Sequence, residues 1–123
     1  MEDLYFSMQK NGTIGKYDIV KLIGEFDLNE VNFFEKKLLS LIGREGGDWQ
    51  ACLLVLDISE LEYLDSSAIG AFVRLYREIV EKGKGKLFFF KPKEFIEELF
   101  QISNLKNFLS VVHTKKELEE KCL

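Results

Sequence analysis

Two short runs of uninterrupted apolar residues constrain the fold of this 123-residue chain more than any other feature. The first spans residues 51–56 (ACLLVL) and the second spans residues 87–90 (LFFF). Apolar runs of this length without alternation are typical of strands that are covered on both faces, in the interior of a sheet. Between the runs, apolar residues recur at helical spacing from Ile69 to Val80. A strand, a helix and a second strand in this order predict parallel pairing through a right-handed crossover.

Three further helices are predicted from apolar residues at three- and four-residue intervals. Their ends are marked by residue types that start or stop helices, namely capping residues, proline and residues that tolerate the left-handed conformation. For the same reason, Gly83 is expected to end the helix between the apolar runs in the left-handed conformation. The three further helices run from Asp27 to Gly43, from Pro92 to Asn104, and from the capping box of Thr114 and Glu117 to the C-terminus.

Strands are also predicted near residues 4–9 and 16–23, with Asn11-Gly12 as the turn of a hairpin, and a short extended piece at 111–112. The chain is long enough for one ordinary domain, so residues 1–123 are interpreted as a single domain. The predicted fold class is α/β, with a mixed central β-sheet of about four to five strands and about four helices packed on it.

Composition excludes several classes of function. Seventeen Lys and Arg residues against 21 Asp and Glu residues give a formal charge of −4, which disfavours nucleic acid as a partner. The chain has one histidine, His113, and two cysteines, Cys52 and Cys122, without metal-ligand spacing, so no metal and no cofactor are expected. No apolar stretch approaches the ~20 residues of a membrane span. A cytoplasmic protein without membrane association is therefore expected.

The segment Asp65-Ser66-Ser67 lies where a helix is predicted to begin, and its polar side chains have a structural and a functional interpretation. Asp and Ser are preferred N-caps, because their side-chain oxygens accept hydrogen bonds from the first free amides. A serine at a helix N-terminus also tolerates an added phosphate, so it suits a phosphorylation switch. Asp27 has the same ambiguity, with Glu30 three residues later. A hydrolase built from Ser66, His113 and Asp65 is disfavoured, because no Gly-x-Ser-x-Gly elbow is present.

A basic cluster surrounds the second apolar run. Its usual explanation is a solvated rim that discourages pairing at a sheet edge, and the alternative is a surface for an acidic partner or phospholipid. The cluster consists of Lys82, Lys84, Lys86, Lys91 and Lys93.

Four segments of the chain are similar to signatures of the STAS domain, in its anti-sigma factor antagonist branch. The segments are Gly24-Glu25-Phe26-Asp27, Leu56-Asp57-Ile58-Ser59, Leu64-Asp65-Ser66-Ser67-Ala68-Ile69-Gly70 and Ile102-Ser103-Asn104-Leu105. The resemblance covers about residues 4–121, and the Asp-Ser-Ser block is its most specific part. Two positions depart from the family pattern, since Ala68 and Asn104 stand where the family often has glycine.

The resemblance implies a binding protein that is a kinase substrate and not an enzyme. In the family, the unphosphorylated form binds an anti-sigma factor serine kinase and so releases a sigma factor, and phosphorylation of the serine at Ser66 switches binding off. A metal-dependent serine phosphatase restores the unphosphorylated form, and the domain is expected to be a monomer or weak dimer. The alternative is a STAS-domain structural adaptor, or a regulatory subunit of a transporter or lipid-trafficking complex, without phosphorylation. The partner-binding residues implied are Asp27, Asp65, Ser66, Ser67, Ala68 and Ile69.

Overall fold

The two apolar runs lie side by side at the centre of a five-stranded sheet in the computed structural model, which describes residues 6–123. The strands follow the order β1-β2-β3-β4-β5 across the sheet. β1 and β2 are antiparallel and the other neighbouring pairs are parallel, so the predicted mixed α/β sheet is confirmed. The strands are β1 (Phe6–Ile14), β2 (Tyr17–Phe26), β3 (Leu53–Leu64), β4 (Lys86–Phe90) and β5 (Ser110–Val112).

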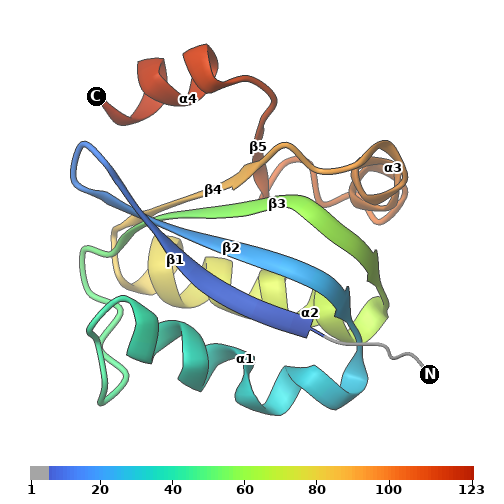
Figure 1. Ribbon diagram of the computed structural model, residues 1–123, viewed down its shortest axis with the longest axis horizontal. Coiled ribbons are helices and arrows are strands. Elements are labelled where there is room, and N and C mark those ends of the chain that lie inside the picture. Colours follow the sequence, from blue (N-terminus) through green and yellow to red (C-terminus); the bar gives the residue numbers. More distant parts are fainter. Residues whose placement is uncertain (1–5) are drawn as a thin grey trace.

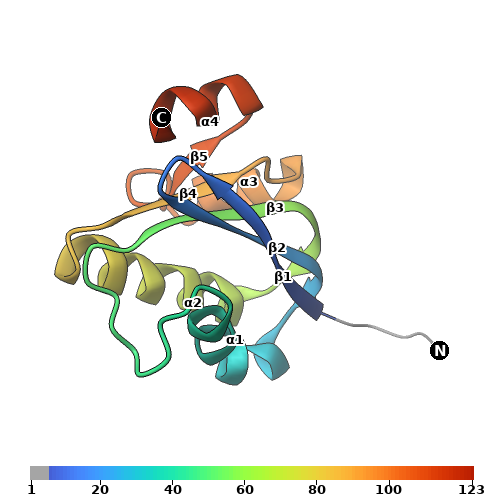
Figure 2. The same cartoon turned by 60° about the vertical axis from the view of Figure 1, so that its left-hand side comes forward.

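The helices cover both faces of this sheet (Figure 1). Helices α1 (Leu28–Leu41) and α2 (Ser66–Tyr76) lie together on one face, and α2 continues into a π-helical segment, η1 (Arg77–Lys82). Helix α4 (Lys115–Cys122) lies on the opposite face, as the rotated view also shows (Figure 2). Helix α3 (Glu94–Ile102) connects β4 to β5. Among residues 6–123, no helix is long and apolar enough to cross a membrane.

Side-chain alternation along the strands divides the apolar core into two clusters. In β3, Leu54 and Leu56 belong to the larger cluster, which includes residues of α1, α2 and α3, while Val55 faces α4. Phe26 at the end of β2 contributes to the larger cluster through aromatic pairs, with ring centroids 4.8 Å from Phe34 and 5.5 Å from Phe72. The ends of β2 and β3 are therefore anchored in the core next to the helices that follow them.

The hairpin between β1 and β2 turns at a different place from the one predicted. Ile14 pairs with Tyr17, so Gly15 and the residue after it form the turn. Asn11-Gly12 lies instead within a register shift of β1, where Gly12 has a φ of 85°. The Asn-Gly dipeptide thus predicts a residue with positive φ, and such a residue occurs in β-bulges as well as in hairpin turns. Residues 4 and 5 of the predicted first strand lie outside the described residues.

Strands β2 and β3 are longer than the sequence predicts. β2 extends to Phe26 instead of residue 23, and β3 extends to Leu64 instead of residue 56. The buried residues Leu61 and Leu64 are separated by the exposed Glu62 and Tyr63, so this part of β3 lacks a simple strand pattern. Its pairing with β2, which ends at Phe26 opposite Leu64, supports the extension.

Two further predictions are wrong. Gly83 has a φ of −85°, and the left-handed conformation falls on Lys84, with a φ of 60°. Glycine is required at position 83 for close approach, since a Cβ there would lie 2.6 Å from the Trp49 carbonyl oxygen. The lysine cluster does not follow a full sheet edge either, because within residues 6–123 β5 pairs with residues 88–90 of β4 and leaves only Lys86 and Leu87 unpaired on that side. Asn104 does adopt the expected left-handed conformation, with a φ of 60°.

Candidate functional site

The paired ends of β2 and β3 place two helix N-termini next to each other. Phe26 is paired with Leu64 in parallel register, and one aspartate follows each strand before the next helix begins. The backbone N–H of Asp65 donates to the carbonyl oxygen of Phe26 at 3.3 Å. Asp27 and Asp65 therefore occupy equivalent N-cap positions at the same end of the sheet, although they are 38 positions apart in the sequence.

Asp65 joins these two helices through its carboxylate. Its Oδ1 accepts a hydrogen bond from the Ala68 N–H at 3.0 Å, which caps α2. Its Oδ2 accepts a hydrogen bond from the Leu28 N–H at 3.1 Å, in the first residue of α1. A carboxylate is favourable at a helix N-terminus because it offsets the partial positive charge there, and Asp65 does so for two helices. The sequence predicts the cap of α2 but not the bond to α1.

Asp27 caps its own helix, as the sequence predicts. Its Oδ1 accepts a hydrogen bond from the Asn29 N–H at 2.9 Å. The Glu30 N–H donates to the backbone carbonyl of Asp27 at 3.0 Å. Among the described residues, no hydrogen bond joins the Asp27 N–H to the Glu30 carboxylate, so the capping box expected from the pattern does not form. Within residues 6–123, no hydrogen bond or ion pair engages Asp27 Oδ2, and this half-buried carboxylate retains an acceptor for a partner.

The four residues after Asp65 differ in accessibility. Ser66 is the first residue of α2 and is exposed, whereas Ser67 is half-buried. Ala68 is fully buried in the core, and Ile69 packs against the same core. The Ser66 hydroxyl has no hydrogen-bond partner in the described part of the chain, and neither do the amides of Ser66 and Ser67. Ser66 is thus the hydroxyl of this segment that a second protein reaches most easily.

Large apolar side chains border this site. Leu28 at the start of α1 is 64% exposed, and Tyr63 near the end of β3 is 46% exposed. Sequence reasoning did not single out either residue. The sequence did contain a signal for them. Each residue lies within three positions of an N-cap aspartate and outside the buried apolar pattern of its helix or strand. Apolar side chains around a polar centre are typical of protein-binding surfaces.

His113 does not join this site. Its Nε2 lies 2.7 Å from Glu97 Oε2, and its backbone N–H donates to Glu117 Oε1 at 2.8 Å. Both oxygens of Asp65 accept backbone hydrogen bonds, and no described contact links His113 to Ser66. Residues 6–123 also contain no cluster of three His, Cys, Asp or Glu side chains that could hold a metal ion. The site therefore offers an exposed hydroxyl next to the Asp65 cap, and His113 is not placed to act as its base.

Comparisons with known proteins show which proteins have a similar sequence or fold. The anti-sigma-B factor antagonist of Bacillus subtilis (strain 168) is 28% identical over 92 residues, which cover 75% of this chain and 78% of that protein. The phosphorylated form of the Bacillus cell fate determinant SpoIIAA has a similar fold, with a TM-score of 0.62, 21% identity and coverage of 95% of this chain and 98% of that one.

A transporter contains the same fold. The murine anion transporter Slc26a9 aligns with 97% of this chain at 13% identity and a TM-score of 0.76, but with only 22% of its own chain. The sequence profile of the STAS domain matches residues 5–121, in close agreement with the extent of the resemblance found from the motifs. The chain belongs to the STAS domain family.

Proposed function

We propose that this protein is an anti-sigma factor antagonist whose unphosphorylated form binds an anti-sigma factor serine kinase and so releases a sigma factor. Phosphorylation of Ser66 switches this binding off. The observation that carries the proposal is the exposed Ser66 hydroxyl at the start of α2, next to the start of α1 and its Asp27 carboxylate. The relative from Bacillus subtilis supports the class of function.

The first turn of α2 suits a phosphate. The amides of Ser66 and Ser67 have no acceptor among the described residues, and free amides at a helix N-terminus bind anions. Ala68 does not offer its amide, because Asp65 already accepts from it. Phosphorylation therefore leaves the cap of α2 in place. The proposal is supported by SpoIIAA, a protein of similar fold whose structure is known in a phosphorylated form.

The site residues either contact the kinase directly or hold the contacting residues in position. Asp27, Ser66 and Ser67 contact the kinase directly, with Asp27 contributing the carboxylate oxygen that α1 does not use. Ala68 and Ile69 act from the core, by holding the first turn of α2 in position. Asp65 supplies the connection between the two helices. The protein itself performs no catalysis, and the kinase brings the base and the nucleotide.

A metal-dependent serine phosphatase restores the binding-competent form, and the cycle operates in the cytoplasm. Such a cycle needs a substrate serine that is accessible to two different enzymes. Ser66 meets this requirement because it is exposed at the helix start and has no hydrogen-bond partner within residues 6–123. Ser67 is half-buried and meets it less well.

The structure of Slc26a9 favours a second candidate. STAS folds also form part of a transporter, so this chain is alternatively a structural adaptor or regulatory subunit that is not phosphorylated. The adaptor needs a partner surface but no kinase. The two functions therefore differ in whether Ser66 carries a phosphate in the cell.

The proposal is tested by purifying the chain with its partners from a detergent-solubilised lysate of its native cells, measuring intact mass with and without phosphatase treatment, and locating any phosphate by peptide mapping. We expect one phosphate, which maps to Ser66, and a co-purifying kinase with the unphosphorylated form. Ser66→Ala should abolish the modification, while the matched variant Ser67→Ala should retain it. A phosphate that maps to Ser59, Ser67 or Ser103 would contradict the assignment, and an unmodified chain bound to a membrane transporter would favour the adaptor.

A further inference from the structure

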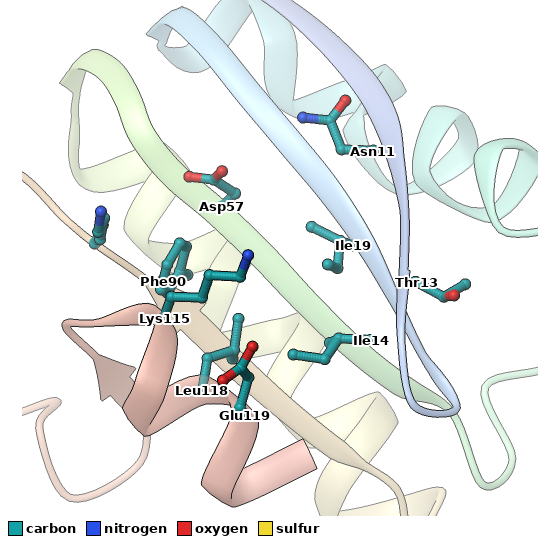
Figure 3. Close-up of a pocket in the computed structure, with 10 residues that line it drawn as sticks. Asn11, Thr13, Ile14, Ile19, Asp57, Phe90, Lys115, Leu118 and Glu119 are labelled. Carbon is teal, nitrogen blue, oxygen red and sulfur yellow. The ribbon is translucent and has the colours of Figure 1, made fainter. Parts of the chain in front are cut away.

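A hollow of about 520 Å³ lies on the other face of the sheet, between α4 and the β1–β2 hairpin (Figure 3). Sites for small molecules are typically about 300–1,000 Å³ in volume. One end of the hollow is bounded where the hairpin turn meets the end of α4, since a Cβ on Gly15 would lie 2.6 Å from the Cys122 carbonyl oxygen. The hollow is thus a defined feature of this face and is remote from α1 and α2.

Apolar side chains from β1, β2, β4 and α4 surround the hollow. Ile19 of β2 and Phe90 of β4 form its floor, and Ile14 and Leu118 form parts of its walls (Figure 3). Ile14, Ile19 and Phe90 remain half-buried, so α4 does not cover them completely. Filling the hollow with an apolar group would remove their remaining surface from water, which is favourable. An apolar body is therefore the first requirement for a ligand.

Two lysines supply positive charge at the hollow. Lys115 extends from the start of α4 across the opening (Figure 3), and Lys91 is the residue that follows β4 in the sequence. Among residues 6–123, no carboxylate lies within salt-bridge distance of either amine. Lys91 also has a φ of 54°, and residues held in such conformations cluster at ligand sites. The Lys91 amine lies over the ring of Phe90, 5.5 Å from its centroid, and neither amine has a carboxylate partner among these residues, so both can bind an anionic group.

Two carboxylates supply negative charge at the same hollow. Asp57 projects from β3 next to Phe90, with which it is paired in the sheet, and Glu119 projects from α4. Asp57 Oδ1 accepts a hydrogen bond from the Ser59 N–H at 3.0 Å, while Oδ2 has no protein donor among the described residues. The lining therefore carries two positive and two negative side chains around an apolar floor.

We propose that this hollow is a binding site for a small zwitterion with an apolar body, such as an apolar α-amino acid. The ligand carboxylate binds Lys115 and its ammonium group binds Glu119, one turn further along α4, while Asp57 and Lys91 balance the charge on the side of the sheet. The apolar side chain lies over Ile19 and Phe90. A zwitterion matches the balanced charge of the lining, whereas an anion or a cation alone leaves two like-charged groups without a counter-charge.

The test is a titration of the full chain with L-phenylalanine, followed through the backbone amide resonances in NMR spectra. Saturable shifts are expected at residues 14–19, 57, 90 and 115–119, with a dissociation constant on the order of 1 mM for a ligand of this size. 3-Phenylpropionate lacks the ammonium group and 2-phenylethylamine lacks the carboxylate. Each should bind about three- to fivefold more weakly.

Charge variants separate the two halves of the site. Lys115→Gln should weaken L-phenylalanine and 3-phenylpropionate but not 2-phenylethylamine, and Glu119→Gln should weaken L-phenylalanine and 2-phenylethylamine but not 3-phenylpropionate. Lys116→Gln is the matched control, because Lys116 is an exposed neighbour on α4 that does not line the hollow. The proposal is wrong if no saturable shift appears by about 10 mM, if the three ligands bind equally, or if the two lysine variants behave alike. It does not depend on the kinase, so its failure would leave the assignment of Ser66 untouched.

Discussion

Replacing Asp65 with asparagine is expected to keep one of the two hydrogen bonds of this side chain and to remove the other. Asparagine keeps one acceptor oxygen and is as good an N-cap as aspartate, so the bond to the Ala68 N–H survives. The amide group that replaces the second oxygen is a donor and faces the Leu28 N–H, which also donates. The variant therefore loses the bond that links α2 to α1, together with a negative charge next to two helix N-termini.

The size of this loss follows from the setting of the lost bond. A hydrogen bond to a charged group contributes about 1.5–3 kcal/mol to stability when it is shielded from water. Leu28 is 64% exposed, so water replaces part of the interaction and the lower end of that range applies. We expect Asp65→Asn to lower the free energy of unfolding by about 1–2 kcal/mol, which corresponds to a decrease in Tm of about 4–8 °C for a chain of this length.

Urea unfolding followed by the fluorescence of Trp49, the single tryptophan, measures this change. Asp27→Asn is the matched control, because Asp27 bonds only within its own helix and asparagine keeps that cap. Its loss should stay below about 0.5–1 kcal/mol. Hydrogen exchange of the Leu28 amide should accelerate in Asp65→Asn and not in Asp27→Asn. Equal losses for the two variants, with unchanged exchange at Leu28, would refute the role of Asp65 as a link between the helices.

Three further predictions concern the switch and the core. Ser66→Ala should melt within a few degrees of the parent and still bind the kinase, because the cap of α2 belongs to Asp65; loss of binding at unchanged Tm would show that the hydroxyl itself contributes affinity. Asp27→Asn should clearly reduce the phosphorylation rate or kinase affinity with little effect on stability, and unchanged kinetics would reassign Asp27 to structure. Burial raises the pKa of the Cys52 thiol to about 11, from an ordinary value of 9.0, so the folded state favours the neutral thiol. Its stabilising contribution should be complete below pH 9 and decline as pH rises toward 11, and a Cys52→Ala variant with the same alkaline decline as the parent would contradict this.

Local signals in the sequence predicted the elements well, because each depends on residues that are close together in the chain. Asp27, Asp65 and Thr114 each accept a hydrogen bond from an amide of the helix they were predicted to cap. Asn104 closes α3 in the predicted conformation. In the last helix, however, the Glu117 carboxylate accepts from the His113 N–H and not from Thr114, so the predicted capping box forms in part. Residue type thus predicted well which backbone amides at the helix ends are capped by a side chain. It predicted less well which side chain caps each amide.

Positions that depend on pairing between distant segments were predicted poorly. The turn of the first hairpin was predicted at Asn11-Gly12, but this dipeptide provides the positive φ of a bulge in β1. The turn itself contains Gly15, where a side chain would collide with the end of α4. The bond from Asp65 to Leu28 depends on β2 and β3 ending in register, at Phe26 and Leu64. No local pattern reports this register. The two candidate segments were therefore visible in the sequence, while their connection required the sheet.

Because the starts of α1 and α2 lie together, a phosphate on Ser66 would affect a surface formed by both helices. A phosphate on Ser66 would add a charge of about −1.5 to −2, beside two carboxylates, in a chain that already carries a formal charge of −4. Converting a mostly bound complex to a mostly free one requires a change of about 5.5 kcal/mol. At the rim of an interface, screening over a Debye length of ~8 Å would leave far less than this. The exposed Leu28 is bonded through its N–H to Asp65, and the exposed Tyr63 precedes Ser66 by three positions. A partner that buries these apolar residues would therefore also exclude water from the phosphate. The strength of the switch therefore depends on burial of this apolar border as much as on the charge itself, since an uncompensated charge is costly only where water is excluded.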